Sequence, residues 1–291
     1  MDFCRQKGIQ EDLLFELGML KRAEDNGIYP MFRERIMIPV RNRWGRIIAY
    51  TAQYIGTNSK VPKYINSATS LIYTKGETLF GIDRAFRLRN PENIIIVEGA
   101  PDVLRMQSIG LVASLGTAWN ENQLELLKRH TASLCFIPDS DVSEDGLPGA
   151  GFKAAMENGA LAIRKGFHVT VRELPLGCRE LTKEELQKMY EGQAIPPEAA
   201  REVPMKNDTD SYIQDEATYR NLREKHFIVW NAEKLFQTAD SLAGQQKVVA
   251  QTADLLRYVK DQMVYDQCIE QLGQVYGKAK LWKEAVTQAR N

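Results

Sequence analysis

The sequence predicts an α/β protein with a mostly parallel sheet, preceded by a small basic α+β segment and followed by a helical segment. Between about residues 93 and 172, apolar β-branched runs alternate with helix-like stretches, which is typical of parallel sheets covered by helices. The preceding segment, 31–92, has short runs of alternating hydrophobicity. The last segment, 215–291, has helix formers and few glycines, which favours a bundle.

Length, charge and cysteines limit the classes of protein that fit. A chain of 291 residues has room for two or three domains. The formal net charge is zero, yet the stretch from Arg33 to Arg89 has eleven Lys or Arg against three acids, a net charge of +8. This stretch is either a surface for polyanions or a solvated basic face. The four scattered cysteines predict a reduced, cytoplasmic protein without a zinc site, and no apolar run is long enough for a membrane span.

The first ninety residues predict helices and then a hairpin. Residues 1–30 carry leucines at helical spacing and are expected to be helical. Residues 35–41 and 46–54 then predict two strands joined by a four-residue turn. A short strand is expected at 63–66 and a helix at 82–89.

From residue 93 the predicted elements alternate between strands and helices. The expected strands and helices are, in order, 94–97, 101–109, 111–114, 121–130, 133–137, a helix ending near 165, and 168–172. An insertion at 176–206 interrupts this order, with a helix expected at 181–190 and a loop at 193–204. Three or more helices and no further strand are expected from Asp215 onward.

A carboxylate stands directly after the first of these strands. Glu98 is followed by Gly99, which permits a sharp turn, and Pro101 suits the first turn of the next helix. Sites in parallel sheets form beyond the carboxyl ends of the strands, so Glu98 is either a catalytic residue or a solvated turn residue. Asp102 either supports Glu98 or is a first-turn acid favoured by the helix dipole.

Two further acidic pairs follow later strands. Asp139 and Asp141 come directly after the strand 133–137, and Asp208 and Asp210 come after the insertion. Each pair alone is typical of a turn or a helix N-cap. Together with Glu98 they would meet at one sheet edge, where close carboxylates need a counterion. We therefore expect a Mg²⁺ site with these five residues, in which Glu98 is a ligand or the general base.

These motifs resemble the TOPRIM domain of primases, topoisomerases and some nucleases. The closer resemblance is to the catalytic core of DnaG-type bacterial primases, because a basic subdomain precedes the TOPRIM motifs. The segments that carry the resemblance are Val97-Glu98-Gly99, Ser114-Leu115-Gly116-Thr117, Asp139-Ser140-Asp141 and Asp208-Thr209-Asp210, with Arg35-Ile36-Met37-Ile38-Pro39-Val40, Pro62-Lys63-Tyr64-Ile65-Asn66-Ser67 and Lys75-Gly76 upstream. Topoisomerases and nucleases lack the upstream subdomain. The resemblance covers roughly residues 31–215.

The resemblance implies a domain order and several departures from the family. The expected order is an N-terminal helical segment 1–30, a basic subdomain 31–92, a TOPRIM Rossmann-like domain 93–214 with the insertion 176–206, and a helical domain 215–291. The zinc-binding module of the family is missing, and the loop after Asp141 is longer than usual. The pattern indicates a divergent primase of a plasmid, phage or mobile element, or a fragment of one.

The resemblance also implies an activity. A primase core joins nucleoside triphosphates into short RNA primers on single-stranded DNA with Mg²⁺ (or Mn²⁺), using two ions, and works beside a replicative helicase. Asp102 is counted with the catalytic acids. The expected nucleotide- and DNA-binding residues are Arg35, Arg41, Lys63, Tyr64, Asn66 and Lys75. The alternatives are a TOPRIM nuclease that uses the same acids to activate water, and a non-catalytic remnant that binds single-stranded DNA or a helicase.

Overall fold

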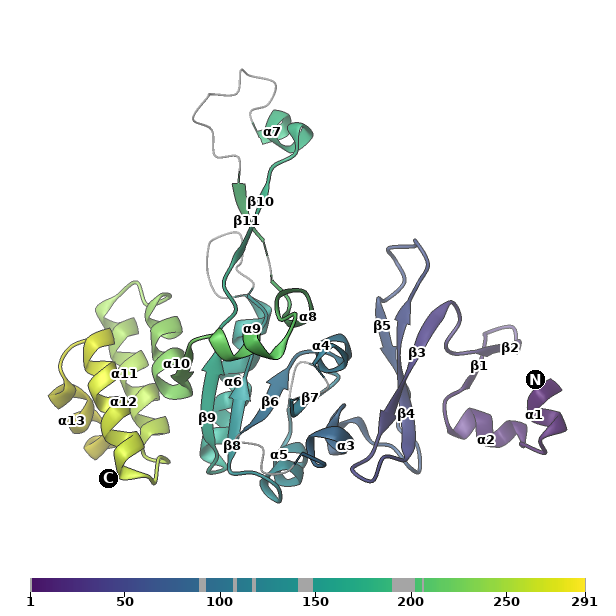
Figure 1. Cartoon of the computed structure of the whole chain (residues 1–291), viewed down its shortest axis with the longest axis horizontal. Helices are drawn as coiled ribbons and strands as arrows, with labels where there is room; N and C mark the ends of the chain where they lie inside the picture. The colour runs from purple at the N-terminus through teal and green to yellow at the C-terminus, as the bar shows by residue number, and fades with distance from the viewer. Residues whose placement is uncertain are drawn as a thin grey trace. The chain divides into compact units, whose positions relative to one another are not determined.

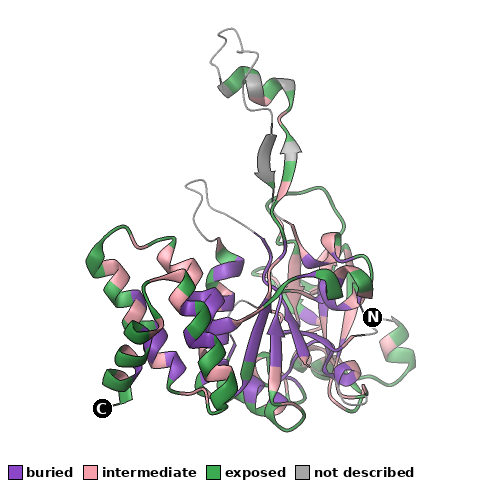
Figure 2. Cartoon of the chain, turned by 60° about the vertical axis from the view of Figure 1, so that its left-hand side comes forward, coloured by how far each residue is buried: buried purple, intermediate pink, exposed green. Residues whose placement is uncertain are grey.

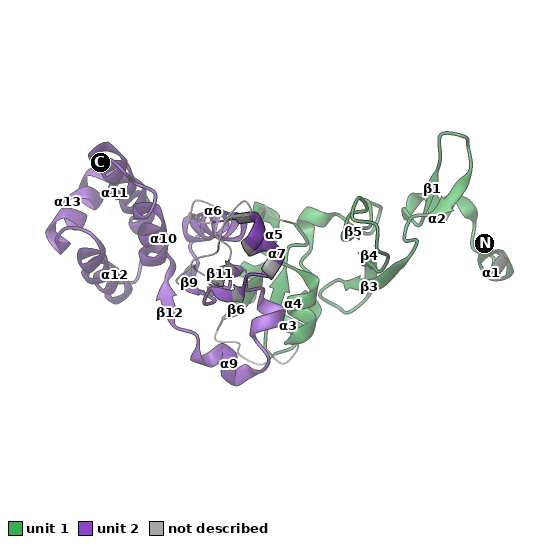
Figure 3. Cartoon of the chain, turned by 90° about the horizontal axis from the view of Figure 1, so that it is seen from above, with its two compact units in different colours: residues 1–132 green, residues 133–291 purple. Residues whose placement is uncertain are grey.

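The computed structural model of the chain (Figure 1) describes residues 2–88, 93–106, 109–116, 119–140, 149–189, 202–205 and 207–290. The chain divides into two compact units, 1–132 and 133–291 (Figure 3). The division falls inside the segment expected to form one domain, 93–214. Each unit has its own buried core, and in both the strands of the α/β part are mostly buried (Figure 2).

The first thirty residues of unit 1 are helical only in part. Helices α1 (Asp2–Gln6) and α2 (Glu11–Glu16) are followed by an antiparallel pair, β1 (Leu20–Arg22) and β2 (Ile28–Pro30). The prediction of a helical segment is therefore wrong from Leu20 onward. Gly18 at φ +66° stops the helix, and Asn26 at φ +63° allows the tight turn between the two strands.

The basic segment contains the predicted hairpin and the predicted short strand, which together form a three-stranded antiparallel sheet. Its strands are β3 (Arg35–Arg41), β4 (Ile47–Tyr54) and β5 (Tyr64–Asn66), in the order β3-β4-β5. The turn between β3 and β4 is closed by Asn42, whose Oδ1 accepts hydrogen bonds from the backbone N–H groups of Trp44 and Arg46, both at 3.1 Å. Gly45 adopts φ +84°, which favours glycine at this position.

The rest of unit 1 alternates between helices and strands. Its elements are the short helix η1 (Lys75–Glu77), α3 (Ile82–Ala85), β6 (Ile94–Val97), α4 (Ala100–Arg105), β7 (Leu111–Ala113) and α5 (Glu121–Lys128). Strands β6 and β7 are parallel, with Val97 opposite Ala113. Every residue of both strands is buried, which explains why the sequence shows continuous apolar runs without alternation.

Unit 2 continues the same order of elements. Strands β8 (Ser133–Phe136) and β9 (His168–Arg172) are parallel and are connected through α6 (Ala150–Arg164). A third strand, β12 (Glu224–His226), pairs antiparallel with β9. The predicted absence of strands after Asp215 is therefore wrong. Strand β12 is three polar residues long at the edge of this strand set, so it leaves no apolar pattern in the sequence.

The insertion begins and ends as a paired stem. Strand β10 (Gly177–Glu180) pairs antiparallel with β11 (Glu202–Met205), with Gly177 opposite Met205, and α7 (Lys183–Met189) lies between them in the chain. Because the two strands pair, the two ends of the insertion lie side by side. The expected loop at 193–204 is wrong for β11, and residues 190–201 lie outside the described part of the chain.

The remaining part of unit 2 is helical. Two short helices, α8 (Thr209–Tyr212) and α9 (Glu216–Asn221), precede four longer ones, α10 (Phe227–Phe236), α11 (Leu242–Leu256), α12 (Gln262–Val275) and α13 (Ala279–Arg290). The fully buried Trp230 of α10 donates a hydrogen bond from Nε1 to Oε2 of Glu173 at 2.8 Å. Lys234 Nζ lies 2.6 Å from the other oxygen of Glu173. These contacts attach α10 to the segment after β9.

The described helices do not include one that is both long and apolar enough to cross a bilayer.

The cysteines Cys4, Cys135, Cys178 and Cys268 are free thiols. Cys135 is buried in β8, as its apolar sequence neighbours predict, and burial raises its pKa to about 11.

His226 makes the folded chain sensitive to acid. It precedes α10, its Nδ1 accepts a hydrogen bond from the N–H of Ile228 at 3.2 Å, and its ring centroid is 5.3 Å from that of His168. Burial, with a smaller contribution from His168, lowers the pKa of His226 from 6.5 to about 3. In the unfolded chain His226 is therefore protonated as the pH falls through about 6.5, whereas in the folded chain it stays neutral until about pH 3. The stability from the neutral ring is complete above pH 6.5 and is lost as the pH falls toward 3.

We expect the free energy of unfolding to fall by about 2 kcal/mol between pH 8 and pH 5 through this residue alone. His226→Asn keeps a side-chain acceptor at the N-cap and removes the titration, so the variant should lose less stability over this interval. Urea unfolding of both proteins at the two pH values measures the difference. An equal loss in wild type and variant would assign the acid sensitivity to other groups.

Candidate active site

Glu98 stands at the carboxyl end of β6, and a local hydrogen bond fixes the turn that carries it. The side chain of Glu98 is exposed. The backbone N–H of Gly99 donates to Oδ2 of Asp102 at 2.8 Å, and the Asp102 side chain is buried. Asp102 therefore stabilises the start of α4 directly after Glu98. This contact is that of a first-turn acid of α4, and a further role of Asp102 at Glu98 stays a prediction.

The neighbouring strand ends in a strained turn at the same edge. Because β6 and β7 are parallel with Val97 opposite Ala113, Glu98 and Ser114 leave the strand pair on the same side. Ser114 is buried, and its hydroxyl donates to the carbonyl of Gly116 and accepts from its N–H at 3.3 Å. Leu115 between them adopts φ +58°. Such a conformation costs about 1–3 kcal/mol for a residue with a side chain and is concentrated at functional sites.

Two residues of the basic segment reach this turn. Asn66 donates from Nδ2 to the carbonyl of Leu115 at 3.2 Å. The ammonium group of Lys75 lies over Gly116, where an added Cβ would be 2.8 Å from Lys75 Nζ. Gln123 of α5 holds the segment of Lys75 in place, because its Nε2 donates to the carbonyls of Lys75 and Thr78 at 3.4 Å and 3.0 Å. The structure thus brings Asn66 and Lys75 to the edge where Glu98 lies.

The other predicted basic residues differ in their contacts. Arg35 donates from Nη1 to the carbonyls of Ala52 and Lys63 at 3.4 Å and 3.3 Å, and Arg41 donates to the carbonyl of Gly45 at 2.7 Å. Both arginines therefore support the β3–β4–β5 sheet. Lys63 is exposed, with its Nζ 5.7 Å from the ring centroid of Tyr64. This pair presents a charge next to an aromatic ring.

In unit 2, the two acidic motifs are joined by a β-bridge. The N–H of Ser140 donates to the carbonyl of Asn207 at 3.0 Å, and the N–H of Asn207 donates back to the carbonyl of Ser140 at 3.3 Å. Asp139 precedes Ser140, and Asp208 follows Asn207. The bridge therefore joins the segments that carry the two acids, although Asp139 and Asp208 are 69 positions apart in the sequence.

Pro175 and the stem of the insertion complete this junction. The carbonyl of Pro175 accepts from the hydroxyl of Ser140 at 3.1 Å and from Nδ2 of Asn207 at 2.8 Å. Gly177 opens the stem, and a Cβ there would be 2.9 Å from Oδ1 of Asn207. The base of the insertion thus holds the acidic segments together. Sequence reasoning assigned no such role to the insertion, because hydrogen bonds between distant residues leave no local pattern.

The second acidic pair lies at the first turn of α8. Asp208 precedes the helix, Asp210 lies in its first turn, and Thr209 between them is almost fully buried. The hydroxyl of Ser211 donates to the carbonyl of Asp208 at 2.9 Å. Asp139 is buried as well, with 5% of its surface exposed. Asp139, Asp208 and Asp210 are therefore held on a fixed backbone.

The predicted metal site consists of Glu98 and four acids of unit 2. Asp141 lies outside the described residues. Among the residues that the structure describes, no group of three or more His, Cys, Asp or Glu side chains could hold a metal ion, so the expected cluster stays a prediction. The donor chemistry of Asp139 and Asp208 fits Mg²⁺, which binds one or two carboxylates and completes its shell with water and substrate phosphates.

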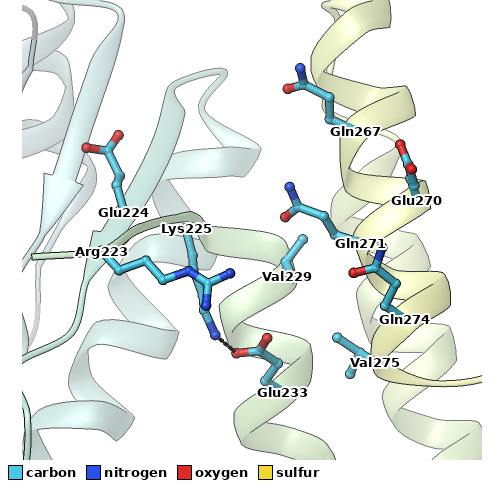
Figure 4. A pocket seen from close by; sticks show the side chains of 10 residues that line it. All are labelled: Arg223, Glu224, Lys225, Val229, Glu233, Gln267, Glu270, Gln271, Gln274 and Val275. Atoms are coloured by element: carbon cyan, nitrogen blue, oxygen red, sulfur yellow. Dashed lines mark hydrogen bonds and ion pairs between the residues drawn. The ribbon is translucent and has the colours of Figure 1, made fainter.

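A polar pocket of about 610 Å³ in unit 2 contains none of the predicted site residues (Figure 4). It lies beside β12 and α10, opposite α12. The lining side chains are Arg223, Glu224, Lys225, Val229, Glu233, Gln267, Glu270, Gln271, Gln274 and Val275. Lys225 is paired with Glu233 at 2.5 Å, and Glu224 accepts from Arg172 at 2.6 Å. Charges of both signs meet in this pocket, so it has no preference for an anion or a cation.

Two family models match the chain and together span more than half of it. The model of the DNA primase catalytic core, N-terminal domain, matches residues 1–86, and a Toprim-like model matches residues 95–185. The first match ends before Glu98 and includes residues 31–86 of the basic segment. The second includes Glu98, Asp102, Asp139 and Asp141 but ends before Asp208.

Proteins with similar sequences are named DNA primases. A DNA primase of Staphylococcus aureus is 28% identical over 275 residues, which are 90% of this chain and 42% of that protein. A DNA primase of Pasteurella multocida is 42% identical over 143 residues, 48% of this chain and 24% of that protein. The chain thus spans less than half of the length of these curated relatives.

Solved structures share the fold. A DNA primase domain from Pseudomonas aeruginosa has a TM-score of 0.66 at 24% identity and covers 95% of this chain and 79% of its own. A DnaG primase catalytic domain bound to ssDNA has a TM-score of 0.67 at 23% identity and covers 97% of this chain and 81% of its own. Together with the Toprim-like match, these likenesses confirm the predicted α/β TOPRIM fold.

Proposed function

Because the chain belongs to the DnaG-type primase catalytic cores, we propose that it synthesises short RNA primers on single-stranded DNA from nucleoside triphosphates. The observation that carries this proposal is the bridge between Ser140 and Asn207, which joins the segments of Asp139 and Asp208. Two carboxylates held on neighbouring backbone segments suit a centre for phosphoryl chemistry. The match of residues 1–86 to a primase domain favours a primase over a TOPRIM nuclease.

The acids would hold the metal, and Glu98 would take the proton. Asp139, Asp141, Asp208 and Asp210 are the proposed ligands of Mg²⁺ or Mn²⁺, with two ions bound. Bound metal would stabilise the charge on the attacking and the leaving oxygens. In the reaction the 3′-hydroxyl of one nucleotide attacks the α-phosphate of the next, the bond between the α- and β-phosphates breaks, and pyrophosphate leaves. Glu98 accepts the hydroxyl proton or binds a metal ion.

The basic residues would hold the two polyanionic substrates. Lys75 projects over the turn after β7, at the edge where Glu98 lies, and its charge suits a triphosphate. Lys63 beside Tyr64 suits a template phosphate next to a base. Asn66 fixes the turn through Leu115. We further propose a cytoplasmic protein of a plasmid, phage or mobile element that works beside a replicative helicase.

The test of the proposed function is a synthesis assay with the protein as it stands. The chain is incubated with single-stranded DNA, labelled nucleoside triphosphates and Mg²⁺ or Mn²⁺, and the products are separated by length. Labelled oligonucleotides that depend on template and metal support a primase. Shortened template without labelled product would instead identify a nuclease. Neither product, with DNA still bound, would identify a binding remnant.

The exposed Lys63 and Lys75 should dominate the binding of single-stranded DNA near the candidate active site. We expect Lys63→Ala with Lys75→Ala to remove most of the affinity at low salt. Removing two phosphate contacts should also reduce the slope of log affinity against log salt by about 1.4. Fluorescence anisotropy with a labelled oligonucleotide at several KCl concentrations measures both quantities.

The matched control is the pair Lys247→Ala and Lys283→Ala, two exposed lysines of α11 and α13. The control should bind as wild type does, because none of the predicted DNA-binding residues lies on the C-terminal helices. Equal binding by both double variants would mean that Lys63 and Lys75 form a solvated basic face.

A further inference from the structure

The tip of the β3–β4 hairpin exposes a tryptophan on a rigid turn. Trp44 is 67% exposed, while Asn42 fixes the backbone on both sides of the turn through its hydrogen bonds. The guanidinium carbon of Arg43 lies 4.3 Å from the centroid of the Trp44 ring. A large exposed aromatic side chain is unfavourable in water unless another group covers it. The Arg–Trp pair is therefore a ready platform for a planar group.

Two other segments of unit 1 add positive charge beside this turn. A Cβ at Gly45 would be 2.6 Å from Nη2 of Arg87, so the side chain of Arg87 reaches the turn. Phe86, the residue before Arg87, stacks on His130 with the ring centroids 3.4 Å apart. Arg129 is the residue before His130. Burial, followed by the charges of Arg43 and Arg129, lowers the pKa of His130.

These residues form what we call the tip patch. Its members are Arg43, Trp44, Arg46, Arg87, Arg129 and His130. In the described part of the chain, none of its four arginines takes part in an ion pair. The carboxylates on the adjoining helices α3 and α5 are the buried Asp83 and the exposed Glu121 and Glu125, so the four arginines outnumber them.

The tip patch lies at the opposite end of the hairpin from Lys63, one of the two proposed substrate lysines. Tyr64, next to Lys63, pairs with Gln53 near the end of β4, whereas Trp44 lies before its start at Ile47. At roughly 3.3 Å per residue, the strand separates the two ends by about 20 Å. The patch is therefore a surface separate from Lys63 and Tyr64.

We propose that the tip patch is a second binding site for single-stranded nucleic acid, in which a base stacks on Trp44 and the arginines contact the adjacent phosphates. Unpaired arginines suit phosphates, and an exposed aromatic ring suits the face of an unstacked base. An acidic peptide would use the charge but gain little from the ring. The proposal rests on the proposed function for the identity of the polyanion, which is single-stranded nucleic acid. It predicts that the bound strand extends beyond the sheet edge that carries Glu98.

The intrinsic tryptophan fluorescence can report directly on binding at Trp44. Trp119, Trp230 and Trp282 are buried, whereas Trp44 is exposed. Addition of a thymidine oligonucleotide should therefore quench the exposed component of the tryptophan fluorescence, and Trp44→Phe should abolish that quenching. Trp44→Ala should weaken binding of the oligonucleotide roughly tenfold, the usual range for loss of one stacking platform, while Trp44→Phe should retain most of the affinity.

An abasic oligonucleotide of the same length separates stacking from charge. Trp44→Ala should leave its affinity unchanged, whereas Arg43→Ala with Arg87→Ala should weaken both oligonucleotides and lower the salt dependence. Thermal unfolding of each variant checks the fold. Unchanged affinity of Trp44→Ala for the thymidine oligonucleotide would overturn the proposal. Polyglutamate that quenches and competes as strongly as DNA would also overturn it and point to an acidic peptide.

The variant Asp139→Asn distinguishes the failure of this inference from the failure of the proposed function. It should lose primer synthesis but keep the Trp44 quenching, because Asp139 belongs to the proposed metal site. A wild-type chain that shows quenching without any synthesis would reject the primase activity and keep the tip patch. A chain that synthesises primers but shows no effect of Trp44→Ala on binding would keep the primase activity and reject the tip patch.

Discussion

Glu98→Gln is expected to lower the rate of primer synthesis by roughly 10²–10⁴-fold, the usual contribution of a general acid or base. The amide keeps the size of the side chain and removes its charge, so it can neither accept the hydroxyl proton nor bind a divalent cation well. Glu98 is exposed, and the turn that carries it is held by Gly99 and Asp102. The melting temperature should therefore stay within a few degrees of that of wild type.

Two measurements separate the possible roles of Glu98. If Glu98 is a metal ligand, the residual activity of the variant should require more Mg²⁺ for half-saturation. If Glu98 is the general base, the Mg²⁺ requirement should stay constant and the rise of the rate with pH should change. Glu157→Gln, an exposed acid on α6, is the matched control and should keep full activity. Full activity of Glu98→Gln as well would make Glu98 a solvated turn residue.

Much of the fold could be predicted because its strands are buried on both faces. The run Ile94–Val97 has no polar residue, and in the structure every one of its residues is buried, as expected for the middle of a parallel sheet. The β3–β4 hairpin was equally clear, because Asn42 and Gly45 are residues that a tight turn requires. In both places the local pattern and the tertiary structure agree.

The misassigned elements are short strands that carry no such pattern. Strands β1, β2 and β12 are three residues each, too short to show alternation. The leucines between Leu13 and Leu20 have helical spacing although Gly18 stops the helix before Leu20. A single glycine at positive φ decides the outcome there, and the periodicity of the apolar residues is the weaker signal.

Residues of the candidate site were predicted, but the contacts that hold them were not. The strand-end rule selects Glu98, Asp139 and the acids around α8. The connection through Pro175 to Ser140 and Asn207 depends on pairing of the insertion stem across residues that sequence reasoning treats as a detour. Likewise, the charge of Lys75 suggests a phosphate, yet only packing brings it over Gly116.

Gly159→Ala is expected to destabilise unit 2, although the same change usually stabilises a helix. Gly159 lies inside α6, where alanine is favoured over glycine by about 1 kcal/mol. A Cβ at this position would however overlap the ring of Phe227 from α10, at 2.5 Å from Cδ2 and 2.7 Å from Cζ. The glycine is therefore a contact point between α6 and α10.

The ring of Phe227 has no room to move away. It is fully buried, and its centroid is 6.0 Å from that of Trp230, which is also fully buried. Trp230 in turn is tied to Glu173 by its hydrogen bond. Overpacking of such a core costs about 1–3 kcal/mol. We expect this cost to exceed the gain in helix propensity, so that the free energy of unfolding falls.

Urea unfolding measures the effect, with an unchanged slope showing that the transition stays cooperative. Ala160→Gly, the next position of α6, is the matched control and should cost about 1 kcal/mol through helix propensity alone. Adding Phe227→Leu to Gly159→Ala should restore part of the loss, because the smaller side chain makes room for the new methyl group, and the double-mutant cycle should show coupling. A Gly159→Ala protein more stable than wild type would mean that α6 and α10 are not in close contact at this point.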